Sequence, residues 1–439
     1  MEDPSKVARY AHPGPNEPKP KASKSKSSYK TRVKDYFFGP RDPTRHSKIP
    51  MFFRLHGSIL PHLIVPMFMI GIWSTAISYI FLKTWIDDNG KKTNRAANHS
   101  LDSLMLTVMG FLVGIGLSFR NSTAYERFNE GRKYWSALTS YTTNLARLIW
   151  IHAKERDEFQ KEDLLKKITA LNLLIGFSKA LKHRLRFEPY IDYEDLKPYV
   201  GFLDTYARDA NVGVSVIKPK DPNKFKAFLE ILGLSFAKDN PRAMLKSAKR
   251  PLGNLPMEIL VYLGGYFDDC FENKTLTVAV YQQQSIIGLQ NLKDVLTGCD
   301  RILNTPIPIA YSITITQLSW AYLLILPFQV IKKLHWNTIP ATLLAAYIIL
   351  GLGYIGREIE NPFGHNVNDL QLDQFCDQIE HDVDVIMSKP APKAPNFMKK
   401  ADSMPLYPAF GGDYDDWAAK SKEEILWALR EKMEMRAFQ

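Results

Sequence analysis

The 439-residue sequence lacks the short motifs that mark common enzyme sites. It contains no H-E-x-x-H, no phosphate-binding P-loop, no G-x-S-x-G and no paired-cysteine motif. One match to G-x-G-x-x-G, at 351–356, lies inside an apolar stretch rather than between a strand and a helix, so it predicts close helix packing by small residues. We therefore expect a protein that is not an enzyme.

Cysteines are also scarce, and they are not arranged in pairs. The sequence has three cysteines, Cys270, Cys299 and Cys376. They cannot build a disulfide framework, so we expect them to be reduced. The first fifty residues contain no apolar run of the kind found in a signal peptide. The net charge of +11 favours anionic lipid or small anions as partners. Nucleic acid is not expected, since no recognition motif accompanies the charge.

Long apolar segments are what the sequence does contain. About 20 apolar residues cross a bilayer as a helix, and four runs meet that requirement closely enough. The sequence therefore predicts an all-α, multi-pass membrane protein with four transmembrane helices and cytosolic helices within 120–300. The four expected spans cover residues 59–82, 102–119, 309–331 and 338–356.

The second span is the element around which the chain is organised. Ser103 to Phe119 carry no charge, and from Arg120 the sequence becomes polar while it keeps helix-forming character past Trp150. A spacing of four residues puts three side chains on one helical face: Leu104, Val108 and Leu112. This stripe indicates either lipid contact and packing, or a hydrophobic constriction formed by several subunits around an axis. Leu106 is expected on a different face.

Composition divides the chain into three parts. Residues 1–50 are rich in Lys, Ser and Pro and are expected to form a disordered basic tail, with attraction to an anionic membrane surface as the alternative. The membrane-spanning core is expected over 51–376. Residues 377–439 are expected to form a C-terminal tail with short helices, one of them opened by a capping box of Ser421 and Glu424.

Four spans place both termini on the same side of the membrane. The basic N-terminal flank and the arginine-rich end of the second span indicate that this side is the cytosol, although Lys332 and Lys333 fall on the opposite side. The plasma membrane is favoured as the location.

Four separate stretches resemble the bestrophin family, in its fungal, plant and bacterial branch. They are SFRNSTAYERF at 118–128 with EGRKYW at 130–135, GCDRILNTPIPIAY at 298–311, LPF at 326–328 with HW at 335–336 and IP at 339–340, and EIENPFG at 358–364. Their order and spacing agree with the family over roughly 50–376. The signature residues carried over are Arg120, Tyr125, Asn361, Pro362, Phe363 and Gly364.

This resemblance implies a homopentameric anion channel of the chloride type, with membrane lipid around it and one central pore. Aligned on Arg120 and Tyr125, the family's pore-neck positions fall on Leu104, Val108 and Leu112. The cytosolic aperture falls on Val280 or Tyr281. The resemblance thus favours the interpretation of the stripe as a hydrophobic constriction. A carrier of organic anions and a non-conducting membrane scaffold remain the alternatives.

Two further expectations concern charged residues. Animal bestrophins follow the NPFG motif with a run of acids that holds calcium, whereas in this chain Asp369 alone keeps a carboxylate in that stretch. Calcium needs several oxygen ligands, so we expect no cofactor and no high-affinity calcium clasp. Four basic residues after the second span are candidates for a basic wall of the cytosolic passage, although a solvated outer face is the favoured alternative for each: Lys179, Lys182, Arg184 and Arg186.

Overall fold

A computed structural model describes residues 57–86, 92–94, 103–188, 190–210, 253–400 and 402–437. All of them belong to one compact unit, Leu55–Gln439. The basic tail predicted over 1–50 lies outside the described residues. The described chain is helical, as predicted, except for a short antiparallel pair of strands, β1 (Thr84–Ile86) and β2 (Lys92–Asn94), in the loop after the first span.

Within the described ranges, three helical stretches are long and apolar enough to cross a membrane: Leu60–Leu82, Leu104–His152 and Ile309–Glu358. The first corresponds to α3 (Leu60–Leu82) and the second to α4 (Ser103–His152). The 3-10 turn η4 (His335–Asn337) divides the third into α12 (Ile309–Leu334) and α13 (Thr338–Glu358), which pack against each other. The four predicted apolar helices are therefore present.

The apolar helices pack through small residues and branched side chains. Helix α3 contacts α12 and α13, and their shared core contains Leu63, Ile70, Leu323 and Leu350. A Cβ atom on Gly351 would lie 3.1 Å from Ile59 Cδ1, so this glycine brings α13 close to the start of α3. The G-x-G-x-x-G match is thus a helix-packing feature, as predicted.

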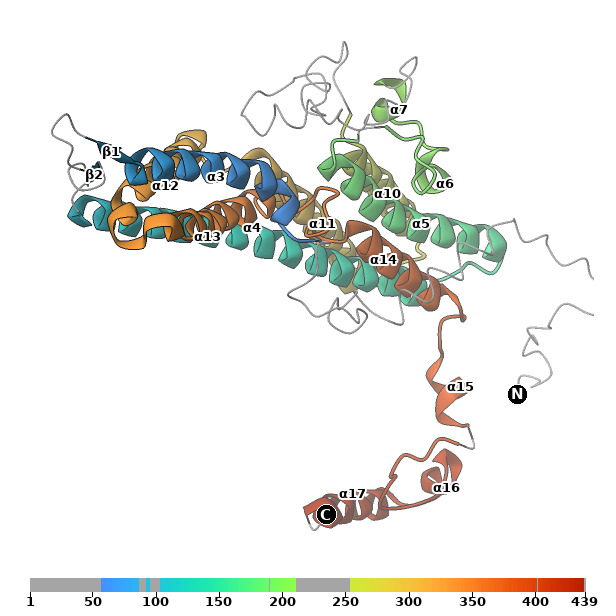
Figure 1. Cartoon of the computed structure of the whole chain (residues 1–439). Helices are drawn as coiled ribbons and strands as arrows, with labels where there is room; N and C mark the ends of the chain where they lie inside the picture. Colours follow the sequence, from blue (N-terminus) through green and yellow to red (C-terminus); the bar gives the residue numbers. More distant parts are fainter. Residues whose placement is uncertain are drawn as a thin grey trace, which may run out of the picture. The chain divides into compact units, whose positions relative to one another are not determined.

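Helix α4 continues from the apolar region into the soluble part without a break (Figure 1). It contacts α12 and α13 along its first half, and α5, α11 and α14 along its second half. The soluble helices share the largest core of the described chain. They are α5 (Gln160–Leu185), α10 (Leu255–Glu272), α11 (Ala279–Asn304) and α14 (Leu372–Met387).

Sequence signals explain how several of these helices begin. Pro256 occupies the first turn of α10, where a missing N–H costs nothing, and the acids of the first turn of α5 complement its dipole. Ser421 and Glu424 form the predicted capping box, with Glu424 N donating to Ser421 Oγ at 3.2 Å and Ser421 N donating to Glu424 Oε2 at 2.8 Å. The helix that they open is α17 (Lys422–Ala437).

The boundary that we expected at 376 falls inside α14. Cys376, Ile379 and Val383 of this helix are buried in the large core, so α14 belongs to the body rather than to the tail. The remaining helices of the described chain are short: α6 (Lys197–Val200), α7 (Tyr206–Ala210), α15 (Ala394–Met398) and α16 (Tyr414–Ala418).

Candidate pore surface

One face of α4 is buried along the whole helix. In the apolar half, Leu106, Val113 and Leu117 are buried, and the last two pack with Ile315 of α12. In the soluble half, the same face buries Leu138 and Ile149. At about 100° per residue these five positions stay within roughly 30° of one direction. Helix α4 therefore presents one constant side to the rest of the chain.

The opposite face of α4 carries the predicted stripe. Leu104, Val108 and Leu112 are 69%, 51% and 49% exposed, while Leu106 is buried, so the expected separation of the two faces is confirmed. Phe111 and Ile115 are exposed on the same side. The structure thus brings the three stripe residues together on a surface that no other described element covers.

The two candidates for the aperture differ in their surroundings. Val280, in the first turn of α11, is exposed. The ring of Tyr281 stacks on His152 at the end of α4, with 3.9 Å between ring centroids. Val280 is consequently the one whose side chain is available to line an opening.

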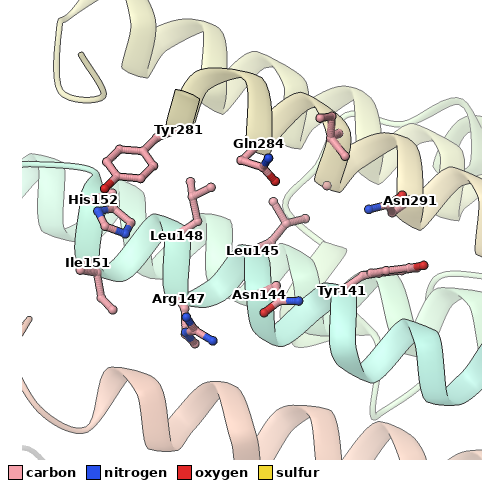
Figure 2. A pocket seen from close by; sticks show the side chains of 12 residues that line it. Tyr141, Asn144, Leu145, Arg147, Leu148, Ile151, His152, Tyr281, Gln284 and Asn291 are labelled. Carbon is pink, nitrogen blue, oxygen red and sulfur yellow. The ribbon is translucent and has the colours of Figure 1, made fainter. Parts of the chain in front are cut away.

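A groove lies between α4 and α11, and this stacked pair is part of its lining. It has a volume of about 330 Å³ and is lined by Asn144 and Arg147 of α4 and by Gln284 and Asn291 of α11, among others. Figure 2 shows Leu145 and Leu148 pointing from α4 toward α11, whereas the Arg147 side chain projects from the side of α4 that faces away from α11. Sequence reasoning did not single out this groove, because it depends on how two distant helices meet.

Among the signature residues, Pro362 and Phe363 pack against α4 at Gly131. Arg120 is buried at the end of the apolar segment, whereas Tyr125 is exposed. Phe363 is fully buried, and a Cβ atom on Gly131 would lie 3.1 Å from its Cε1. Asn361 is exposed, Pro362 is buried and Gly364 is partly exposed in the same turn.

Arg127, within the quoted signature, makes a clamp that the sequence did not reveal. Its Nη2 donates to the carbonyl of Ile302 at 2.5 Å, its Nη1 donates to that of Thr305, and its Nε donates to that of Glu360 at 3.0 Å. Two of these carbonyls end α11 and need partners, since a helix leaves its last carbonyls without intrahelical donors. Arg127 therefore joins α4, the end of α11 and the turn after α13.

The comparison with protein families decides the identity. Residues 41–385 match the model described as Bacterial/Fungal Bestrophin protein. The chain belongs to the bestrophin family. A protein of Synechocystis named voltage-dependent anion channel-forming protein is 30% identical over 356 residues, which cover 80% of this chain and 96% of the relative. A Nostoc protein of the same name is 36% identical over 283 residues, covering 64% and 76%.

Solved structures show the same fold. A bacterial bestrophin homologue from Klebsiella pneumoniae has a TM-score of 0.52 and 23% identity, and the match covers 74% of this chain and 99% of that one. The chain is therefore an all-helical bestrophin and a membrane protein.

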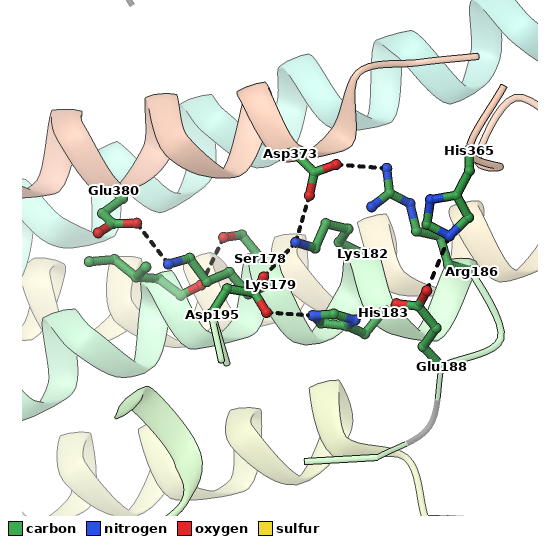
Figure 3. A network of polar contacts seen from close by, with 11 residues as sticks. Ser178, Lys179, Lys182, His183, Arg186, Glu188, Asp195, His365, Asp373 and Glu380 are labelled. Carbon is green, nitrogen blue, oxygen red and sulfur yellow. Dashed lines mark hydrogen bonds and ion pairs between the residues drawn. The ribbon is translucent and has the colours of Figure 1, made fainter. Parts of the chain in front are cut away.

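For Lys179, Lys182 and Arg186 the structure contradicts both the candidate basic wall and the solvated outer face, because their side chains are nearly buried in ion pairs of the soluble part (Figure 3). Lys179 is 2% exposed, and its Nζ lies 2.7 Å from Glu380 Oε2. Lys182 is buried between Asp195 and Asp373. The other two candidates are paired as well, Arg184 with Asp300 and Arg186 with Asp373. Helical spacing alone could not distinguish a solvated face from one buried against α14.

The same network contains a histidine between two carboxylates. His183 Nδ1 lies 2.6 Å from Glu188 Oε2, and its Nε2 lies 2.9 Å from Asp195 Oδ1. Burial by itself lowers the pKa of His183, but the hydrogen bonds to Asp195 and Glu188 outweigh it and raise the pKa above the usual value. Burial raises the pKa of Glu188, yet the bonds to His183 and His365 prevail and lower it to about 2. The network therefore favours a charged imidazole between charged carboxylates.

Asp369 lies in the loop where animal bestrophins hold calcium. Its Oδ2 accepts from the backbone N–H of Asn366 at 2.8 Å, and burial raises the pKa of its carboxyl to about 6. The described ranges contain no group of three or more His, Cys, Asp or Glu side chains placed to hold a metal ion. One carboxylate offers fewer oxygens than calcium requires. Calcium independence remains a prediction.

Proposed function

We propose that this chain is one subunit of a homopentameric anion channel, with Leu104, Val108 and Leu112 forming the neck of a central pore. The relatives named anion channel-forming proteins support this function, since one of them is covered over 96% of its length. Chloride and other small anions are the expected permeant ions.

The observation that carries the proposal is the two-sided character of α4. One face is packed along the full helix, and the other is open from Leu104 to the soluble end. The open face runs without interruption from the apolar half of α4 past Arg120 into its polar half. Five such faces around an axis would give a passage that is apolar in the membrane and polar in the cytosol. An apolar ring of this kind gates by excluding water.

Two finer assignments follow from the same arrangement. Val280 is proposed as the aperture residue, because it is exposed while Tyr281 is engaged by His152. Both termini are proposed to lie in the cytosol, with the plasma membrane favoured, on the distribution of Lys and Arg around the spans.

The test is single-channel recording with the purified full chain in planar bilayers, together with mass measurement in detergent. The proposal predicts unitary currents that reverse near the chloride equilibrium potential and a particle of about five times 50.2 kDa. Saturable flux without unitary currents would instead identify a carrier. The absence of any current or flux at every voltage would identify a non-conducting scaffold.

A further inference from the structure

The polar half of α4 continues the face that carries the neck. At about 100° per residue, Leu104 and Leu112 lie roughly 40° to either side of Val108, Asn144 has the same direction as Val108, and Arg147 lies roughly 60° away. The buried side of α4 keeps the same direction from Leu106 to Ile149, so positions on the opposite side can be compared along the whole helix. Asn144, and Arg147 about 60° to one side of it, therefore face the direction of the stripe about 55 Å further along the helix than Val108.

Helix α11 presents one of its faces to the groove beside α4. Val280, Gln284 and Asn291 lie within about 40° of one another around α11. Gln284 and Asn291 line the groove against α4, and Val280 is the exposed residue at its end. The candidate neck and the candidate aperture thus lie on two helix faces that meet at this groove.

The groove presents donors that are not engaged. No carboxylate is among its lining residues. Among the residues that the structure describes, none makes a hydrogen bond or ion pair with the Arg147 guanidinium or with the side-chain amides of Asn144, Gln284 and Asn291. Arg147 is among the lining residues, but its side chain points away from α11 in Figure 2, so binding in the groove requires Arg147 to adopt a different rotamer.

We propose that this groove is an anion-binding subsite for small carboxylates, in which Arg147 supplies the charge and Asn144, Gln284 and Asn291 supply neutral donors. The proposal rests on the proposed function, because it places the subsite on the conduction path between neck and aperture. Anions that have passed the neck would be held here before they reach Val280.

The chemistry of the donors favours a planar oxyanion over a spherical halide. A guanidinium offers two parallel N–H groups that match the two oxygens of a carboxylate, and the amides can donate to the remaining lone pairs. A volume of about 330 Å³ far exceeds what a chloride ion fills and leaves room for a carboxylate with its water.

Formate is the probe, with chloride as the comparison. Thermal unfolding of the detergent-purified assembly is followed as either anion is titrated at constant ionic strength, and bilayer conductance is measured over the same range. The Arg147→Gln variant removes the charge, and Arg147→Lys keeps it without the planar pair of donors. Lys293→Gln is the matched control: it removes one exposed cation from α11 nine residues beyond Gln284, half a turn away from the groove.

We expect formate to raise the unfolding temperature at concentrations about tenfold lower than chloride does, and Arg147→Gln to abolish this difference, as loss of a charge-assisted hydrogen-bond pair implies. Arg147→Lys should retain the response to chloride and lose the preference for formate. Lys293→Gln should behave like the parent. The half-saturating formate concentration for conductance should follow the same order.

Equal responses of Arg147→Gln and the parent would overturn the subsite, as would an effect of Lys293→Gln of the same size. Dissociation of the assembly on Arg147→Gln, without a change in formate response, would mean that Arg147 pairs with a neighbouring subunit and would also overturn it. If the parent carries no current but loses its formate response on Arg147→Gln, the subsite stands and the channel function fails.

Discussion

A Cβ atom on Gly288 would lie 2.4 Å from Leu145 Cδ2, so α11 approaches α4 more closely there than any side chain on that residue would allow. Leu145 is 2% exposed, so its side chain would have to shift to admit a Cβ atom on Gly288. Gly298 makes the same approach to Tyr134 further along α11, where a Cβ atom would collide with the ring. These contacts set the separation of the two helices that form the groove.

Gly288→Ala should therefore destabilise the protein. Overpacking of a filled core costs about 1–3 kcal/mol, which exceeds the roughly 1 kcal/mol that alanine gains over glycine in a helix. Chemical denaturation in detergent measures the change. Gly265→Ala in α10 is the control, because a Cβ atom there meets nothing within 4 Å and should leave stability unchanged or raise it. An unaffected Gly288→Ala would mean that the groove is wider than described.

The Lys179–Glu380 pair makes a second prediction. Glu380→Gln leaves the charge of Lys179, which is 2% exposed, without its carboxylate and should cost about 3 kcal/mol of unfolding free energy. The double variant Lys179→Met with Glu380→Leu removes both charges and should recover most of that loss. Equal stability of the two variants would show that this pair does not require charge compensation.

The pH dependence of stability should show the contribution of the charged His183 imidazole. Because its pKa is raised on folding, its contribution is complete below the unfolded value of 6.5 and is lost as the pH rises through the higher folded value. His183→Gln should therefore be less stable than the parent at about pH 6, with the gap closing as the pH rises above 6.5. Thermal unfolding across this range tests it. A difference in stability between the parent and His183→Gln that is the same at every pH would indicate that the variant loses packing rather than a charge.

Calcium should not be required for opening. Asp369 is the one carboxylate left in the stretch after Gly364, and its Oδ2 already accepts a backbone hydrogen bond. Chelation with EGTA during bilayer recording should leave open probability unchanged. A current that disappears on chelation and returns with micromolar calcium would refute this prediction.

The sequence predicted where the helices lie better than which segments of the chain contact one another. Uncharged runs located the apolar helices, and α12 begins at Ile309 as the prolines before it indicated. The two faces of α4 followed from a spacing of four residues. Lys179 and Lys182 were misread because burial depends on α14, which is about 200 residues away and carries Asp373 and Glu380. The groove and the Arg127 clamp were missed for the same reason: each forms between segments that are distant in the chain.

The central claim is that the exposed face of α4 lines a pore. Replacing Leu104, Val108 and Leu112 together by Ala would widen and wet the neck, so unitary conductance or open probability should rise while anion preference survives. Leu106→Ala is a poor control, since Leu106 is buried. Ile64, Phe68 and Ile72 of α3 make a better one, because they have the same spacing and are likewise exposed.

Single-channel recording of these two triple-alanine variants beside the parent is the most direct measurement. The account predicts a larger or more frequent current from the α4 variant and a parental current from the α3 variant. A parental current from the α4 variant, together with an altered current from the α3 variant, would contradict it and place the pore on a different helix.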